Sequence, residues 1–245
     1  LGEADRVAEI RRSEPDAERR DDLADATYEL GSEGWTAAGR DRSLSDLLAD
    51  LAPDYDYALL VGFPEADVPR VVVGSDRSDG DALGETIVRA DAAEEIDPAE
   101  VRARLHDTDP YETLDSLVAE VKRSDDAPYS GAIATFTGRV RAKESEDDEP
   151  TEYLEFEKYE GVADERMAAI SAELEEREGV LDVRMHHRTG VIEYGEDIVF
   201  VVVLAGHRDE AFRTVEDGID RLKDEVPIFK KEVTTDEQFW VHEQS

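Results

Sequence analysis

Residues 198–204 read IVFVVVL, an unbroken run of apolar side chains. Successive side chains of a strand point to opposite faces, so such a run fits a strand that is covered on both faces. The run is also much shorter than the roughly 20 apolar residues that span a bilayer. It therefore predicts the central strand of a buried sheet.

Predicted helices and strands flank this strand on both sides. The segments 164–178 and 209–225 carry apolar residues at helical spacing, and Pro227 ends the second of them. Two helices packed on a mixed sheet give an α+β domain. The other predicted strands are residues 131–140 (GAIATFTGRV), 153–159, 180–188, 191–194, 228–233 and 239–241.

The chain before residue 128 is less regular. Residues 57–63 (YALLVGF) and 68–73 (VPRVVV) predict two buried strands, and Ser43 is placed to cap a short helix before them. The predicted organisation is a small α/β region at 1–74, a helical connector at 75–127 and the α+β domain at 128–245.

The composition limits the classes of function. The 245 residues include 64 acidic and 28 basic side chains, giving a net charge of -36 that is spread over both halves of the chain. Such acidity opposes nucleic-acid binding and favours work in very high salt, where repulsion is screened. Without cysteine there are no disulfides, thiolate metal sites or cysteine nucleophiles. The sequence shows no membrane span or signal peptide, so we expect a cytoplasmic protein.

Lysines cluster near the end of the chain. Only six residues are Lys, against 22 Arg, and three of the six are Lys223, Lys230 and Lys231. At about 100° per residue Lys223 falls next to Phe212, on the predicted apolar stripe that also includes Ile219. Partial desolvation there favours the neutral amine, a better base or nucleophile. The alternative is a lysine whose charge suits the helix end.

Two further groups of cations stand beside predicted elements. His207 and Arg208 precede the helix 209–225, where free amides favour an anion. Arg139 and Arg141 follow the strand 131–140 at a spacing of two, so they point the same way and are candidates to hold a phosphate or carboxylate. The alternative for His207 and Arg208 is an ordinary surface turn. The alternative for Arg139 and Arg141 is a pair of exposed arginines at a strand end.

The sequence gives poor support for a metal centre. His186 and His187 are adjacent in a predicted strand and would point to opposite faces. The acidic loop 144–149 is of a kind that is usually solvated. We therefore predict no metal and no bound cofactor.

Several segments together resemble the large, catalytic subunit of molybdopterin synthase. They cover about 115 residues in order and with compact spacing. The segments are GAIATFTGRVR (131–141), LEFEKYEGVADERM (154–167), HHRTGVIEYGEDIVFVVVLAGHRDEAF (186–212), LKDEVPIFKKE (222–232) and FWV (239–241).

The resemblance implies a fold and a reaction. The fold is an α/β hammerhead with an added β subdomain. The reaction converts cyclic pyranopterin monophosphate to molybdopterin with two sulfurs from a small ubiquitin-like partner, whose C-terminal Gly-Gly carries a thiocarboxylate. The assembly is a homodimer with one small subunit at each end, a heterotetramer, and the step needs no metal.

The resemblance also assigns roles to residues. Lys223 and Lys230 correspond to the two pocket lysines. The substrate-binding positions fall on Arg141, His207, Arg208 and Lys231, and Arg139 joins them from its place beside Arg141. Phe229 departs from the tryptophan of many relatives but stays aromatic.

The region 1–74 resembles the second half of the GTP-binding adapter protein of molybdopterin guanine dinucleotide synthesis. The segments that carry this resemblance are 26–39, 55–63 and 68–74. No G-x-x-x-x-G-K-[ST] occurs in the chain, and Val61 stands where relatives often carry an acid. We predict no nucleotide binding and a scaffold role.

Two other functions compete with the enzyme. One is a docking module for ubiquitin-like modifiers without turnover, or an acceptor modified on Lys230 or Lys231. The other is a GTP-dependent adapter, which the missing phosphate loop opposes.

Overall fold

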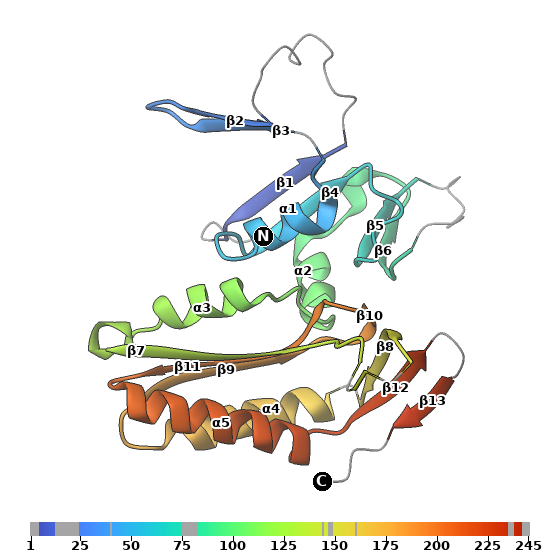
Figure 1. The fold of residues 1–245 in the computed structure, drawn as a ribbon. Coiled ribbons are helices and arrows are strands. Elements are labelled where there is room, and N and C mark those ends of the chain that lie inside the picture. Colours follow the sequence, from blue (N-terminus) through green and yellow to red (C-terminus); the bar gives the residue numbers. More distant parts are fainter. Residues whose placement is uncertain are drawn as a thin grey trace. The chain divides into compact units, whose positions relative to one another are not determined.

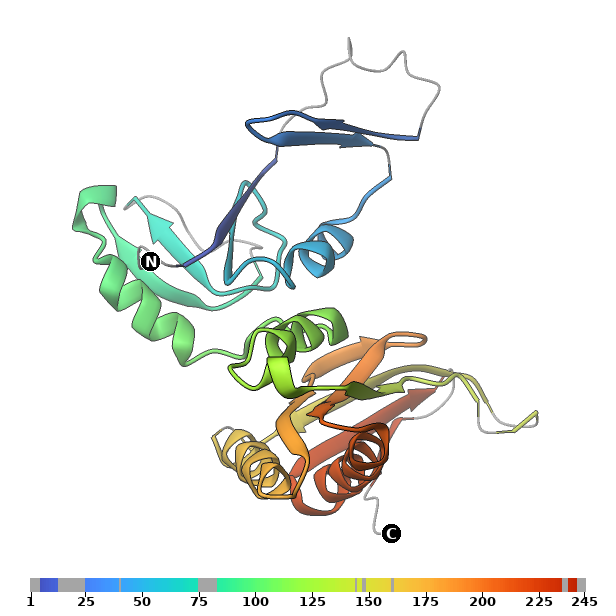
Figure 2. The same ribbon diagram turned by 90° about the vertical axis from the view of Figure 1, so that its left-hand side faces the viewer.

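The computed structural model describes residues 5–12, 25–39, 41–74, 83–143, 145–146, 149–159, 161–234 and 238–241. The chain divides into two compact units, Leu1–Tyr111 and Glu112–Ser245 (Figures 1 and 2). The boundary falls before the last helix of the predicted connector, so that helix belongs to the second unit. Within the described residues no helix is long and apolar enough to cross a membrane.

The centre of the second unit is an antiparallel sheet of three strands. Its order is β7 (Ala132–Arg139), β11 (Asp197–Ala205) and β9 (Val180–His187). Val201, Val202 and Val203 of β11 have no exposed surface. The apolar run is therefore the central strand, as predicted.

Both faces of β11 are covered, each by different helices. Val201 and Val203 belong to the core that contains residues of α4 (Val162–Glu175) and α5 (Arg208–Glu225). Phe200, Val202 and Leu204 pack with Leu117 and Val121 of α3 (Leu114–Lys122). Figure 1 shows α3 on one side of the sheet and the α4–α5 pair on the other. Helix α3 belongs to this unit because it covers the second face of β11.

A second antiparallel sheet has four strands. It is not continuous with the first, so the single mixed sheet of the prediction is wrong, while the combination of helices with antiparallel sheets agrees with the predicted α+β class. The strand order is β10 (Gly190–Glu193), β8 (Thr151–Lys158), β12 (Ile228–Thr234) and β13 (Gln238–Val241).

Helix α5 buries a face that differs from the predicted stripe. The predicted stripe included Phe212, but this side chain is 64% exposed. The buried face includes Gly218, where an added Cβ would lie 3.0 Å from Val201 Cγ1. Small residues of α5 thus face β11 and allow a close approach, and Phe212 lies outside this buried face. The buried residues are Ala211, Thr214, Val215, Gly218, Ile219 and Leu222.

The first unit is built from small sheets. Ser43 caps α1 (Leu44–Leu51) through Asp46 in a capping box, as predicted. The two predicted strands exist as β4 and β5, but they are not buried, since Leu59 is 53% and Val73 40% exposed. The strand pairs are β1 (Val7–Arg11) with β4 (Tyr57–Val61), β2 (Ala26–Leu30) with β3 (Trp35–Gly39) in a hairpin, and β5 (Arg70–Val73) with β6 (Thr86–Ala90). The short helix η2 (Ala93–Glu95) and the helix α2 (Pro98–His106) follow β6. The short helix η3 (Ala127–Tyr129) belongs to the second unit.

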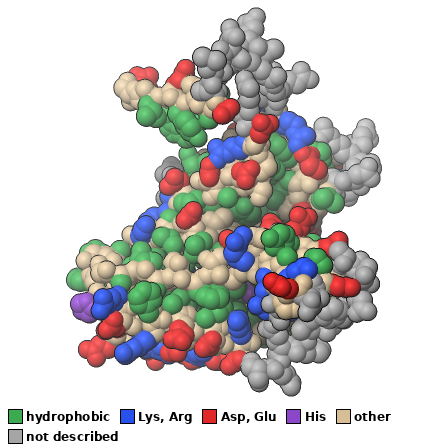
Figure 3. Space-filling model, viewed as in Figure 1, with side chains coloured by type: hydrophobic (Ala, Val, Ile, Leu, Met, Phe, Trp, Pro, Cys, Tyr) green, Lys and Arg blue, Asp and Glu red, His purple; other side chains and the backbone are tan. Residues whose placement is uncertain are grey.

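Acidic side chains are distributed over the surface. Figure 3 shows Asp and Glu in many places on the visible face, with Lys and Arg among them. This agrees with a net charge of -36 that is shared by both halves of the sequence. The predicted acidic loop at 144–149 lies partly outside the described residues.

Candidate active site

One end of the second unit collects four of the predicted cations. Helix α5 runs back along β11, so its last turn with Lys223 lies at the end of the sheet where β11 begins (Figure 1). Arg139 belongs to the same end, because it pairs with Asp197 at the start of β11. Arg141 follows two residues later, and Lys230 lies in β12, directly after α5.

Both arginines lie near the turn that leads into β11. Arg139 Nε lies 3.1 Å from Asp197 Oδ1, and its guanidinium also donates to the carbonyl of Gly195. These contacts tie Arg139 to the turn before β11. Arg141 follows the end of β7 and is exposed, as is Arg139.

The three lysines have different environments. Lys223 is exposed in this chain, which overturns the predicted desolvation: the buried face of α5 lies to one side of Lys223. Lys230 is half-buried and lies opposite Phe156 of β8. Lys231 points to the other face of the sheet, where its Nζ lies 3.1 Å from Glu155 Oε2. The structure therefore does not bring Lys231 together with Lys230.

His207 and Arg208 lie at the opposite end of α5. His207 is the N-cap residue, and Arg208 is 83% exposed beside Asp209. Fifteen residues separate Arg208 from Lys223, which corresponds to about 22 Å along the helix axis. One chain therefore does not place this pair in a pocket with Lys223.

A second lysine, with a nearly buried side chain, lies diagonally across from Lys230 on the same face of the sheet, and sequence reasoning missed it. Lys158 is only 6% exposed, and its Nζ lies 3.0 Å from Asp164 Oδ1 in the first turn of α4. Lys158 pairs with Ile228 in the register of β8 with β12, one step diagonally from Lys230. The sequence pattern that could have predicted it is the alternation in β8, which puts Lys158 on the same face as the buried Leu154 and Phe156.

The two adjacent histidines point to opposite faces, as predicted. The His187 ring packs edge-on against Phe156, with centroids 4.9 Å apart, whereas His186 stacks near Phe200. His187 Nδ1 lies 2.7 Å from the carbonyl of Arg188, to which it donates. Among the described residues no three His, Asp or Glu side chains form a metal-binding group.

Comparison with known proteins gives the family. The family model "MoaE protein" matches residues 107–225. A probable molybdopterin synthase from Haloferax volcanii is 56% identical over 238 residues, 97% of this chain and 89% of the relative. The chain belongs to the molybdopterin synthase catalytic-subunit family. It is therefore an enzyme of molybdopterin biosynthesis, a transferase that transfers sulfur.

Other members of the molybdopterin synthase family match about half of this chain. The catalytic subunit from Bacillus subtilis is 40% identical over 115 residues, 47% of this chain and 72% of the relative. The crystal structure of molybdopterin synthase from Staphylococcus aureus is 33% identical, covers 55% of this chain and 93% of that chain, and has a TM-score of 0.48. The match with the Haloferax relative also extends over the first unit.

The buried His187 predicts how the stability of this molybdopterin synthase depends on pH. Burial lowers the pKa of His187 to about 4, and the charge of Lys158 contributes in the same direction. The unfolded chain binds this proton near pH 6.5, so the stabilisation is complete above that pH and is lost as the pH falls towards 4. Between pH 6.5 and 5 we expect a loss of about 2 kcal/mol from this residue.

Urea unfolding at both pH values, at constant high KCl, measures this loss. His187→Leu serves as the comparison, because the carboxylates titrate in both proteins and cancel in the difference. The stability of the wild type should fall between pH 6.5 and 5 by about 2 kcal/mol more than that of the variant. Equal pH dependence in the two proteins would show that His187 is not kept neutral by burial.

Proposed function

We propose that the chain converts cyclic pyranopterin monophosphate to molybdopterin, using two sulfurs from the C-terminal thiocarboxylate of a small ubiquitin-like partner. The observation that supports this proposal is that Arg141 follows β7, Lys223 lies in the last turn of α5 and Lys230 lies near the start of β12, which together form one end of the second unit (Figure 1). In a chain with 64 acidic side chains, this end offers cations to an anionic substrate and to an anionic donor tail.

The chemistry divides between the arginine and the lysines. Arg141 binds an anionic group and stabilises charge in the transition state. Lys223 and Lys230 transfer protons as the thiocarboxylate sulfur attacks the substrate to form a thioester and as water then cleaves the acyl–sulfur bond, which releases the partner as an ordinary carboxylate. Two partner molecules in succession supply the two sulfurs. A cysteine nucleophile is unnecessary, because the sulfur arrives on the partner. Lys231 and Arg139 support the site through their ion pairs with Glu155 and Asp197.

The distance between the ends of α5 supports a homodimer. We propose that a second copy brings its own His207 and Arg208 to the Lys223 end of the first. A two-fold axis makes such an exchange reciprocal, so that both sites are completed at once. One ubiquitin-like subunit at each end then gives the heterotetramer, on the α/β hammerhead with its added β subdomain.

The first unit is proposed to be a scaffold that resembles the GTP-binding adapter. It contributes no nucleotide site, since G-x-x-x-x-G-K-[ST] is absent from the sequence. The evenly spread acidity supports the proposal that the enzyme works in a cytoplasm of very high salt.

Reconstitution tests the proposed reaction. The chain, in high KCl, is mixed with cyclic pyranopterin monophosphate and a ubiquitin-like partner that ends in a Gly-Gly thiocarboxylate. We expect molybdopterin with the wild type and loss of most activity in Lys230→Ala, with the fold intact. The same partner ending in an ordinary carboxylate should give none, since it brings no sulfur.

The competing docking function gives a different result in this assay. A module that binds ubiquitin-like proteins without turnover would form the complex and make no molybdopterin. An acceptor would instead gain the partner on Lys230 or Lys231 through an amide bond, with loss of hydrogen sulfide as the lysine amine displaces the sulfur of the thiocarboxylate. Either result without product would rule out the proposed reaction.

A further inference from the structure

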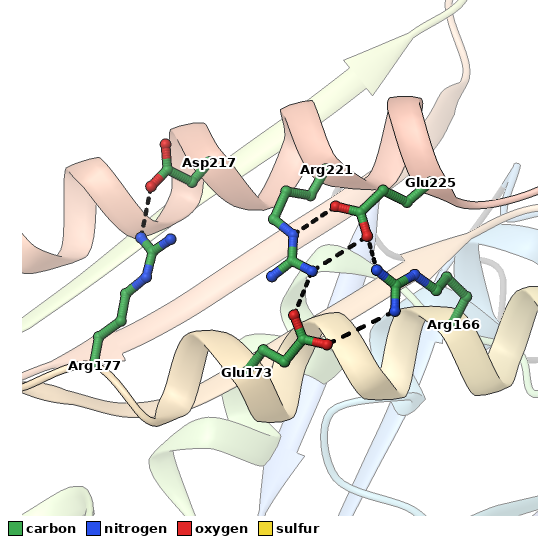
Figure 4. Close-up of polar contacts among 6 residues, drawn as sticks. All are labelled: Arg166, Glu173, Arg177, Asp217, Arg221 and Glu225. Carbon is green, nitrogen blue, oxygen red and sulfur yellow. Dashed lines mark hydrogen bonds and ion pairs between the residues drawn. The ribbon is translucent and has the colours of Figure 1, made fainter.

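A closed network of ion pairs joins α4 to the last turn of α5 (Figure 4). Arg221 donates from Nε to Glu225 Oε1 at 2.7 Å and from Nη2 to Glu173 Oε2 at 2.6 Å. Arg166 closes the ring: its Nη1 lies 3.7 Å from Glu173 Oε1, and its Nη2 donates to Glu225. Each of the four charges thus has two partners of opposite sign.

The network opposes two tendencies of a helix end. The last turn of a helix tends to fray, and a carboxylate there is disfavoured by the helix dipole. Glu225 is the last residue of α5, yet two guanidinium groups hold it. The hydrogen bond from Arg221 also lowers the pKa of Glu173 below its ordinary value. Single exposed ion pairs contribute little, but a ring of them fixes geometry as well as charge.

The fixed turn is the one that carries Lys223. Lys223 lies two residues from Arg221 and two from Glu225, which is about 200° around the helix, so it points away from the network. Strand β12 begins three residues after Glu225 and carries Lys230. No network residue has to touch either lysine to determine where both are held.

We propose that Arg166, Arg221 and Glu225 are positioning residues for sulfur transfer, because their network with Glu173 holds the end of α5 that presents Lys223. This inference rests on the proposed role of Lys223. Displacing a reacting group by about 1 Å can cost on the order of 100-fold in rate. Loosening the helix end therefore lowers kcat, while the surfaces that bind substrate and partner are unchanged.

The same part of the fold supplies a control. Arg177, two residues after the end of α4, pairs with Asp217 of α5 at 2.6 Å (Figure 4). The pair is more exposed than Arg221 and Glu225, but it also ties α5 to the chain of α4 through an arginine and a carboxylate. It lies two turns before Glu225, in the middle of α5, and so it does not hold the last turn.

Steady-state kinetics test the proposal. Glu225→Gln and, as a second variant, Arg166→Met should each lower kcat about tenfold, with KM for the thiocarboxylated partner within about twofold. Arg177→Met should keep kcat within about twofold of the wild type. The proposal is overturned if Arg177→Met loses as much kcat as Glu225→Gln, or if both network variants keep the full rate.

A spin label separates this proposal from the role of Lys223. The chain has no cysteine, so Asp224→Cys takes a single nitroxide label next to Lys223. The label should become more mobile when Glu225→Gln is added and stay unchanged with Arg177→Met. An unchanged spectrum with Glu225→Gln would show that the network does not fix this turn. If instead Lys223→Ala kept full activity, the proposed function would fail while the label still reported on the turn.

Discussion

Lys223→Ala is expected to lose nearly all molybdopterin synthesis while keeping its fold. The side chain is exposed at the end of α5, and alanine is the best helix former, so stability should change little. Activity should fall because the proposed proton transfers lose one of their two amines, and such transfers contribute on the order of 100- to 10,000-fold. The reconstituted assay measures the loss, and the melting temperature in high KCl reports the fold.

Lys122→Ala is the matched control. Lys122 is also an exposed lysine in the last turn of a helix, α3, so its removal changes the charge and the helix end in the same way. Full activity in Lys122→Ala, together with the loss in Lys223→Ala, would assign the effect to the position of Lys223. A Lys223→Ala enzyme with the wild-type rate would contradict the proposed mechanism.

Removal of salt is expected to unfold the enzyme. A net charge of -36 on one chain produces strong self-repulsion, which KCl screens within about 3 Å at 1 M but only within about 30 Å at 0.01 M. Salt also weakens the surface ion pairs, but each exposed pair contributes at most about 1 kcal/mol. Repulsion should dominate, so the melting temperature should rise steeply with KCl.

Thermal unfolding across a KCl series measures this dependence. Sucrose at the same osmolality is the control, because it strengthens apolar burial without screening charge. A rise in KCl much greater than in sucrose would identify screening as the cause. Equal melting temperatures in dilute buffer and in concentrated KCl would contradict the inference from the composition.

The parts of the fold that follow a local pattern could be predicted from the sequence. Seven apolar residues in succession identified β11, and Ser43 identified the start of α1. The unpredicted parts depend on which surfaces meet. The assignment of α3 to the second unit depends on Phe200, Val202 and Leu204 needing a cover, which no local pattern in residues 114–122 reveals.

The candidate site shows the same division. The scarcity of lysine singled out Lys223 and Lys230, but the stripe of α5 was misjudged because Phe212 is large and apolar and yet exposed. The separation of Arg208 from Lys223 follows from the helix rise alone and could have been predicted. The network around Glu225 could not, because it needs the antiparallel packing of α4 and α5.

Lys230 and Lys231 are adjacent in β12 and point to opposite faces of the sheet. The register of β12 against β8 therefore decides which of the two amines faces the site. A one-residue slip of β12 against β8 would exchange the two side chains between the faces of the sheet. Lys231 would then face the site in place of Lys230, and Glu232 would leave that face together with Lys230. Burial of Val233 and the pairing of Lys231 with Glu155 oppose this slip. A one-residue deletion between α5 and β12 would thus keep every charged side chain of the sequence and yet replace the reactive group.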